Sequence, residues 1–373
     1  MSNQIIGFVI GLITAVFLIL ILNVSGFSFL RIAETSSKRR EILSRAIRYR
    51  LSQGPNIVAI GGGTGLSSLL RGIKSFTRNI TAVVAVTDEG GSSGRLRVEW
   101  GVLPPGDVRN CIVALAENDN ALRRILDFRF DRGELSGHSL GNLVLLAVTE
   151  LCGDFRLAVE EMNNLLAIRG RVLPVTTDHV VLAGETKDKK VVYGELEISE
   201  NGSNLEEIWL EPEEAKPVKG ILEAIDESDL IVLGPGSLFT SVIPNLLIQE
   251  FADKIRNSKT PKIYVCNLMT QPKETEGMDI VQHVEWISGA MGCIPDYVLV
   301  NGTQIPEDLL VKYKKDGAFP LLLDRHQAGR IKKMGCEIIE GDFIEVTKDN
   351  VVRHDSQKLA ETLHRQCRMI YKD

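Results

Sequence analysis

The chain has 373 residues, of which 44% are hydrophobic and 25% are charged, as in an ordinary globular protein. Its formal net charge of −6 argues against a general nucleic-acid-binding protein, so we expect no nucleic acid among its partners. The six cysteines are scattered without a Cys-x-x-Cys pair, which argues against a disulfide framework or a cysteine-rich zinc site and favours a reducing compartment.

The N-terminal segment is strongly apolar. Residues 5–30 carry no charged side chain, and an apolar run of about 20 residues is long enough to cross a bilayer. Seven lysines and arginines follow before residue 51, against two glutamates. By the positive-inside rule, the sequence predicts a transmembrane anchor over residues 1–30 and a basic juxtamembrane linker over 31–54. We therefore expect a single-pass protein of the cell membrane, whose domain over residues 55–373 is cytoplasmic.

The rest of the chain alternates short β-rich runs with helical patterns, which is typical of an α/β fold with a doubly wound, Rossmann-like parallel sheet. The sequence predicts strands at 57–60, 81–86, 229–233, 262–267 and 297–300, and helices at 66–75, 106–116, 139–151, 155–168, 240–257, 279–291, 307–315 and 355–370. Short β runs between about 172 and 215, including one at 191–198, predict a small antiparallel insertion. This insertion could serve as a cap or a dimer arm, and we expect a homodimer.

Three glycine-rich loops follow predicted strands. Residues 61–65 (Gly-Gly-Gly-Thr-Gly) follow the first strand, residues 88–95 (Asp-Glu-Gly-Gly-Ser-Ser-Gly-Arg) follow the second, and residues 234–237 (Gly-Pro-Gly-Ser) follow a later one. Glycine lets the backbone approach a ligand closely, and a following helix offers its N-terminal N–H groups to anions. Such loops lie at one edge of an open parallel sheet. Together they predict a site for nucleotide phosphates.

The first loop does not match the common nucleotide-binding fingerprints completely. Leu66 stands where a dinucleotide-binding loop has its third glycine or alanine, although Asp88 lies about where a ribose-binding acid would be. The loop also lacks the lysine of a P-loop. A hydride-transferring enzyme is therefore the less favoured interpretation.

The second loop carries groups that suit a metal and a phosphate. Asp88, with Asp107 from the following Pro-Pro-Gly turn, could hold Mg²⁺ while substrate phosphates complete its coordination. Arg95 could fork onto phosphate oxygens, and His138 at a helix start could reach the same edge. The competing interpretation is structural: the acids cap helices, the arginine forms a surface ion pair, and the histidine is a packing residue.

Six motifs in one order resemble a known family. They are Gly-Gly-Gly-Thr-Gly-Leu from residue 61, the acidic loop at 88–97, Leu-Pro-Pro-Gly-Asp-Val-Arg-Asn from 103, Gly-His-Ser-Leu-Gly-Asn from 137, Gly-Pro-Gly-Ser-Leu from 234 and Cys-Asn-Leu-Met-Thr-Gln from 266. Over residues 55–370 the series resembles the bacterial gluconeogenesis factor (YvcK-like) family, relatives of the archaeal 2-phospho-L-lactate transferases of the CofD group. The chain departs from the family pattern at Glu89, where the usual residue is Asp, and at Phe239, where many members have Tyr.

The resemblance implies two candidate functions. The transferase relatives move a phospholactyl group from a guanosine diphosphate ester to a deazaflavin with Mg²⁺. The bacterial branch is similar to UDP-sugar-binding regulators that link carbon metabolism to cell-envelope synthesis and cell shape, with Tyr313 and Arg353 as implied UDP-sugar contacts. We therefore expect a UDP-sugar, such as UDP-N-acetylglucosamine, or another nucleotide diphosphate as ligand. No cofactor is required for binding, and Mg²⁺ is possible.

The patterns and the resemblance together give one set of candidate residues. The nucleotide-binding candidates are Gly61, Gly62, Gly63, Thr64, Gly65, Asp88, Gly90, Gly91, Ser92, Ser93, Arg95, Asp107, Asn110, His138, Asn142, Gly234, Gly236, Ser237, Asn267, Tyr313 and Arg353, and the metal candidates are Asp88 and Asp107. No residue is assigned a catalytic role, because a phosphate cradle serves binding and group transfer equally well.

Overall fold

The structure is a computed structural model that describes residues 45–117 and 121–370. The chain divides into two compact units, Met1–Gln53 and Gly54–Asp373. In the first unit, residues 45–52 are helical. The second unit carries the fold and all the sites discussed below.

The predicted membrane anchor requires a correction. Its residues, 1–30, lie outside the described part of the chain. Within residues 45–117 and 121–370, no helix combines the length and the apolar character that a bilayer crossing needs. The longest of the helices with stated bounds there, α15 (Ser356–Ile370), has 15 residues and carries lysine, glutamate and arginine side chains. The prediction of a single-pass membrane protein is therefore not supported.

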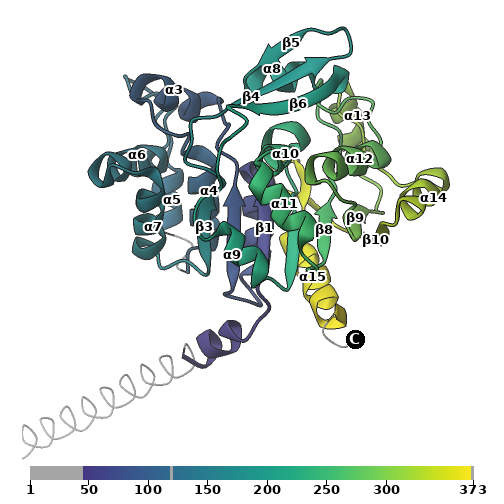
Figure 1. Cartoon of the computed structure of the whole chain (residues 1–373), viewed down its shortest axis with the longest axis horizontal. Coiled ribbons are helices and arrows are strands. Elements are labelled where there is room, and N and C mark those ends of the chain that lie inside the picture. Colours follow the sequence, from purple (N-terminus) through teal and green to yellow (C-terminus); the bar gives the residue numbers. More distant parts are fainter. Residues whose placement is uncertain (1–44, 118–120, 371–373) are drawn as a thin grey trace, which may run out of the picture. The chain divides into compact units, whose positions relative to one another are not determined.

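A seven-stranded parallel sheet forms the centre of the second unit (Figure 1). Its strands are β1 (Ile57–Gly61), β2 (Ile80–Val84), β3 (Arg171–Pro174), β7 (Leu230–Leu233), β8 (Lys262–Val265), β9 (Tyr297–Asn301) and β10 (Glu337–Gly341). They lie in the order β10-β9-β8-β7-β1-β2-β3. The order reverses between β1 and β7, and such a topological switch point opens a crevice at the carboxyl ends of the two strands. The predicted α/β fold with a parallel sheet is confirmed.

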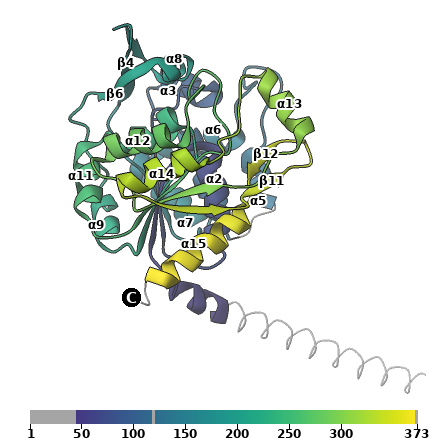
Figure 2. The same cartoon turned by 90° about the vertical axis from the view of Figure 1, so that its right-hand side faces the viewer.

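Helices connect and cover the strands (Figures 1 and 2). They are α2 (Gly63–Ile73), α3 (Gly91–Trp100), α4 (Gly106–Leu115), α5 (Ala121–Asp127), α6 (Leu140–Cys152), α7 (Phe155–Leu165), α9 (Ile221–Asp226), α10 (Ile243–Leu246), α11 (Gln249–Asn257), α12 (Ile280–Met291), α13 (Glu307–Lys315), α14 (Arg325–Met334) and α15. Helix α2 packs against α4 and α15, whereas α12 packs against α10, α11 and α14. Since right-handed crossovers run in opposite directions from β1 and from β7, these two groups cover opposite faces of the sheet.

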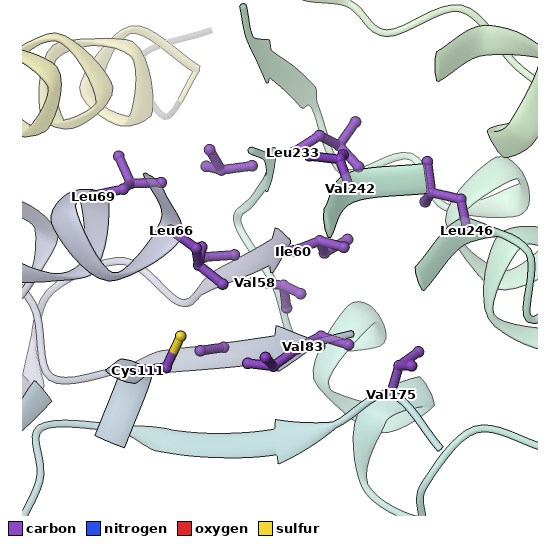
Figure 3. Packing of buried hydrophobic residues seen from close by; sticks show 14 of the residues in the cluster. Val58, Ile60, Leu66, Leu69, Val83, Cys111, Val175, Leu233, Val242 and Leu246 are labelled. Carbon is purple, nitrogen blue, oxygen red and sulfur yellow. The ribbon is translucent and has the colours of Figure 1, made fainter. Parts of the chain in front are cut away.

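The four central strands, β2, β1, β7 and β8, are almost entirely apolar because both of their faces are covered. Every residue of β1, β2, β7 and β8 is buried, as expected for a parallel sheet between two helical layers. Figure 3 shows part of this core, with side chains from β1, β2, α2 and α10. The ends of the central strands are therefore held rigidly, which fixes the loops that follow them.

The antiparallel insertion is smaller than predicted. It consists of β4 (Val181–Thr186), β5 (Val191–Tyr193) and β6 (Leu205–Glu211) in the order β5-β4-β6, with α8 (Glu195–Asn201) between β5 and β6. The predicted start at 172 is wrong because β3 pairs in parallel with β2. The predicted strand over 191–198 ends at Tyr193, because Gly194, at φ 90°, turns the chain into α8.

Two further differences concern the second half of the chain. The helix predicted over 240–257 is broken into a π-helical turn (Leu238–Val242), α10 and α11. Pro244, at the start of α10, has no N–H to continue the helical hydrogen bonds, and the side-chain amide of Asn245 donates to the carbonyl oxygens of Gly61 and Ser241. A hairpin of β11 (Ile344–Val346) and β12 (Val352–His354), which the sequence did not reveal, precedes α15.

Candidate functional site

A cavity of about 630 Å³ lies at the switch point, where the loops after β1 and β7 meet. Its lining residues are Gly62, Gly63, Thr64, Gly65, Ser68, Asp88, Asp107, Glu195, Pro235, Gly236, Ser237, Ser241, residues 267–272, Tyr313, Asp316, Ala318 and residues 352–354. One cavity is therefore surrounded by the first and third glycine loops and by five candidate side chains. These are the predicted metal ligands Asp88 and Asp107, with Asn267, Tyr313 and Arg353. The prediction that these distant segments meet at one edge of the sheet agrees with the structure.

The first turn of α2 presents uncapped backbone groups to the cavity. The N-cap residue Gly62 has no capping side chain, and the first turn contains no acidic residue. The early N–H groups of a helix have no partner inside it and attract anions. Gly63 has φ +63°, a conformation that favours glycine, and its backbone N–H donates to Asp107. Thr64 and Gly65 complete a turn that can receive a phosphate group.

The first and third glycine loops pack directly against each other. A Cβ atom on Gly65 would lie 2.4 Å from the carbonyl oxygen of Pro235, and one on Gly62 would lie 2.5 Å from a carboxyl oxygen of Asp107. At Gly65 the close atom belongs to the backbone, so a side chain does not fit there. The glycines thus let two strand ends approach closely enough to form one continuous backbone cradle.

Side chains from the segment after β8 hold the third loop, residues 234–237, in place. Gln271 donates to the hydroxyl of Ser237 over 2.7 Å, and the Asn267 side-chain oxygen accepts from the Gly236 N–H over 3.4 Å. Glu274, only 3% exposed, accepts from the N–H of Phe239 over 3.0 Å. Burial raises the pKa of Glu274 to about 7. These contacts fix the direction of the Ser237 hydroxyl at the cavity wall.

Three carboxyl groups line the acidic side of the cavity. Burial, followed by the charge of Asp88, raises the pKa of Asp107 to about 7. Burial and the neighbouring charges of Asp88 and Asp107 also raise the pKa of Glu195 well above its usual range. Glu195 comes from the β insertion, and its side chain accepts from the N–H of Glu89 over 2.7 Å. The three acids share a desolvated negative region, which a cation or a proton would stabilise.

These acids fit Mg²⁺ in the way that nucleotide sites usually hold it. Among the described residues, no group of three or more His, Cys, Asp or Glu side chains is arranged as a complete metal site. Mg²⁺ needs only one or two carboxylates when substrate phosphates and water supply the other ligands. Asp88 and Asp107, both at the cavity wall beside the α2 turn, can supply the protein's share.

The cavity wall also carries the aromatic ring of Tyr313, the cation of Arg353 and the neutral imidazole of His354. The Tyr313 hydroxyl accepts from the Val352 N–H over 2.9 Å, so the ring is anchored by its polar end. Arg353 is exposed and forms no ion pair with the described residues, so its charge is available to a ligand. His354 Nε2 donates to the Cys266 carbonyl over 3.2 Å, and burial lowers the pKa of this histidine to about 4.

Several predicted residues lie in a buried hydrogen-bond network beside the cavity, not in its wall. We call Ser92, Arg109, His138 and Asn142 the buried network. Ser92 Oγ lies 3.0 Å from His138 Nδ1 and accepts from the Asn142 amide over 3.1 Å. Arg109 donates to the Asn142 oxygen over 3.2 Å and to Asp127 over 2.6 Å. The network ties together the starts of α3 and α6 and the body of α4.

Other predicted residues also lie outside the cavity wall. The Ser93 hydroxyl accepts from the Gly106 N–H over 3.1 Å, and Arg95 donates to the Ser136 carbonyl over 2.7 Å. The remaining ones are Gly61, Gly90, Gly91, Asn110 and Gly234. A direct ligand contact by any residue of this group, or by Ser92, His138 or Asn142 of the buried network, stays a prediction.

The residue patterns missed seven polar side chains that the structure brings to the cavity. They are Ser68, Glu195, Ser241, Thr270, Gln271, Asp316 and His354. His354 directly follows the candidate Arg353, and Gln271 ends the motif that contains the candidate Asn267, so the flanking positions could have indicated both. Glu195 belongs to the β insertion, and no local motif connects it to the second glycine loop.

Comparisons with known proteins agree with this architecture. The family model described as 2-phospho-L-lactate transferase CofD matches residues 57–344. The gluconeogenesis factor of Bacillus subtilis is 44% identical over 315 residues, which cover 84% of this chain and 98% of the relative. The gluconeogenesis factor of Halalkalibacterium halodurans is 44% identical over 310 residues, which cover 83% of this chain and 95% of the relative.

A solved structure extends the agreement to the fold. A crystal structure of a Bacillus halodurans protein matches with a TM-score of 0.80 and 44% identity, and the match covers 83% of this chain and 99% of that one. The resemblance inferred from the six motifs is confirmed. The chain therefore belongs to the CofD family, and its curated relatives within it are named gluconeogenesis factors.

Proposed function

We propose that the switch-point cavity binds a nucleoside diphosphate sugar, specifically a UDP-sugar such as UDP-N-acetylglucosamine. In this proposal the protein is a regulator that senses the ligand without turnover and links carbon metabolism to cell-envelope synthesis and cell shape. The observation that supports it most directly is the meeting of the uncapped α2 turn with the Gly-Pro-Gly-Ser loop at one cavity of about 630 Å³. That volume lies in the usual range for small-molecule sites.

The cavity offers a place for each part of such a ligand. The diphosphate would lie against the N–H groups of Thr64 and Gly65, with the Ser237 side chain beside it. The Arg353 guanidinium would pair with the phosphate oxygens. The ring of Tyr313 would pack against the uracil or the sugar. The assignment of uridine rests on the family resemblance, whereas the phosphate cradle rests on the geometry.

Mg²⁺ has a defined role in this proposal. A diphosphate placed near Asp88 and Asp107 would meet negative charge, and a magnesium ion between them would remove that repulsion. The ion would supply charge neutralisation and orientation of the phosphates. Binding without a metal is also expected, since protonation of Asp107 reduces the same repulsion.

The second candidate is a transferase that acts on a nucleotide-diphosphate ester. It is favoured by one specific observation: Asp88, Asp107 and Glu195 converge on the phosphate cradle, and the pKa values of Asp107 and Glu195 are raised. Groups with shifted pKa values at a cleft are frequent in enzyme active sites. The matching family model carries a transferase description, which applies to that family as a whole.

A thermal-shift screen of nucleotides separates the two candidates. UDP-N-acetylglucosamine at a hundredfold excess over its Kd should raise the Tm of the protein by about 5 °C, with or without Mg²⁺. GDP should have little effect under the same conditions. A large shift with GDP that requires Mg²⁺, together with no response to UDP-sugars, would favour the transferase and contradict the regulator.

A further inference from the structure

A second and larger recess lies on another face of the fold. It has a volume of about 950 Å³ and is bounded by β6 of the insertion and by α10 and α12. We call it the β6 groove. It shares no lining residue with the switch-point cavity, so the proposed nucleotide ligand does not account for it.

The groove runs along the free edge of β6. All six residues from Leu205 to Leu210 line it, whereas one face of a strand would contribute only every second residue. In the three-stranded sheet β6 is an outer strand, paired only with β4 among the described strands. The groove therefore runs along the unpaired backbone edge of the strand. Ile208 is 9% and Leu210 is 2% exposed, so a segment that pairs there must move aside the side chains that cover these residues.

The ladder pattern identifies which backbone groups point outward. Leu182 of β4 accepts from the Gly194 N–H, so its polar groups face the β5 side. Alternation along β4 then directs Ala183 towards its β6 partner Trp209. By the same alternation along β6, the N–H and C=O groups of Ile208 and Leu210 point away from β4 into the groove. An extended segment alongside β6 could pair with these groups.

The floor and the rim of the groove differ in polarity. The floor is apolar, with Leu246, Met278 and the half-buried Trp286, whose ring packs edge-on against Phe239 at 4.8 Å. The rim is acidic: five glutamates line the groove against two lysines. They are Glu206, Glu207, Glu213, Glu214 and Glu285, with Lys187 and Lys216. An extended segment with alternating apolar and basic side chains would match both surfaces.

Three of the five glutamates on the rim have no ion-pair partner among the described residues. Glu206 pairs with Lys189, and Glu285 pairs with Arg330. Glu207, Glu213 and Glu214 are exposed and form no ion pair with the described residues. A second copy docked edge to edge by a twofold axis would bring the same glutamates face to face. Charge complementarity therefore favours a basic partner over a second copy.

We propose that the β6 groove binds an extended, lysine- or arginine-rich segment of a partner protein, which pairs with β6 as an added strand. Main-chain hydrogen bonds to Ile208 and Leu210 would hold the segment. Its apolar side chains would pack on the floor near Trp286, and its basic side chains would face the glutamate rim.

The test uses synthetic peptides and the full-length protein. The probe is a fluorescent seven-residue peptide, the length of β6, with alternating lysine and valine. Fluorescence anisotropy should detect its binding, and added salt should weaken it. The double variant Glu207→Lys/Glu214→Lys should bind at least about tenfold more weakly. A peptide N-methylated at alternate residues, which cannot donate the pairing hydrogen bonds, should lose about as much.

The matched control changes the same charge elsewhere. Glu150→Lys/Glu161→Lys alters two exposed glutamates on α6 and α7, outside the groove, and should leave the affinity unchanged. The proposal is overturned if no peptide binds, if this control weakens binding equally, or if N-methylation has no effect. Sedimentation that shows a dimer broken by Glu207→Lys/Glu214→Lys would assign the groove to a second copy and overturn it as well.

Discussion

The first and third glycine loops differ from the second loop in how their polar groups are used. At residues 62–65 and 235–237, backbone groups and the Ser237 hydroxyl line the cavity. In the second loop, Ser92 and Ser93 are buried and bonded to other parts of the protein. Similar Gly-Ser sequences after parallel strands therefore serve two purposes, a ligand cradle in one place and a structural joint in the other.

The comparison shows what distinguishes a phosphate loop from a structural one. In the cradle, the N-cap residue Gly62 supplies no capping side chain, and the Ser237 hydroxyl, which accepts from Gln271, still lies at the cavity wall. In the joint, both serine hydroxyls are buried away from the cavity, and a single arginine, Arg109, joins the buried network to Asp127. Changes in the joint should lower stability, whereas changes in the cradle should lower ligand affinity. The predictions below test that separation.

The largest expected effect is on the joint. Arg109→Ala removes a 6%-exposed cation and leaves Asn142 and Asp127 without it, so the free energy of unfolding should fall by about 3 kcal/mol. Urea denaturation measures this change. The matched control is Arg123→Ala, which removes a more exposed partner of the same Asp127 and should cost less than about 0.5 kcal/mol. Equal losses in both variants would contradict a structural role for the network.

The next effect comes from the acid beside the cradle. The pKa of Asp107 is raised to about 7 in the folded protein from an ordinary value of 3.8, so ionising it costs stability as the pH rises from about 4 to 7. Asp107→Asn removes that cost. The rise of this pKa from 3.8 to about 7 corresponds to about 4 kcal/mol, and solvent screening of the half-buried carboxylate should reduce this by about half. The variant should therefore be more stable than the wild type by about 2 kcal/mol at pH 8, with the gain vanishing below pH 4. Urea denaturation in metal-free buffer across this pH range measures it, and a variant less stable at pH 8 would contradict the assignment.

A smaller effect separates the turn geometry from phosphate binding. Gly63 has φ +63° and Gly153 has φ +66°, and a Cβ atom at either position would meet nothing closer than 3.8 Å. Gly63→Ala and Gly153→Ala should each lose about 1 kcal/mol of stability through backbone strain. Only Gly63→Ala should also weaken nucleotide binding, because its new methyl group lies at the cradle. Unchanged affinity in Gly63→Ala would show that the loop is only a turn.

The sequence revealed the cradle because its signals are local. An apolar run followed by glycines marks the end of a buried parallel strand, and the carboxyl ends of such strands share one edge. The contribution of Glu195 could not be read in this way, since it reaches the Glu89 backbone across 106 residues. The direction of a side chain is also absent from a motif. Ser92 and His138 match the family pattern, yet they bond to each other inside the protein.

The limits of local patterns also explain the errors in the predicted secondary structure. Residues 191–198 contain Val, Tyr, Leu and Ile in a strand-like pattern, but Gly194 allows a turn and the chain continues as α8. The region over 240–257 has good helical periodicity, but Pro244 cannot donate a helical hydrogen bond, and the buried amide of Asn245 bonds to the β1 end. In both cases a glycine or a proline interrupts the local pattern.

Calorimetry with UDP-N-acetylglucosamine tests the central claim most directly. The wild-type protein should release or absorb heat with one-site binding, and Arg353→Ala should weaken that binding by about 1.5–3 kcal/mol, or roughly ten- to a hundredfold, because it removes a charged donor to phosphate. Since Arg353 is exposed, the stability of the Arg353→Ala variant in urea should equal that of the wild type. No binding of UDP-sugars by the wild type, or identical affinity in Arg353→Ala, would contradict the placement of the diphosphate in the switch-point cavity.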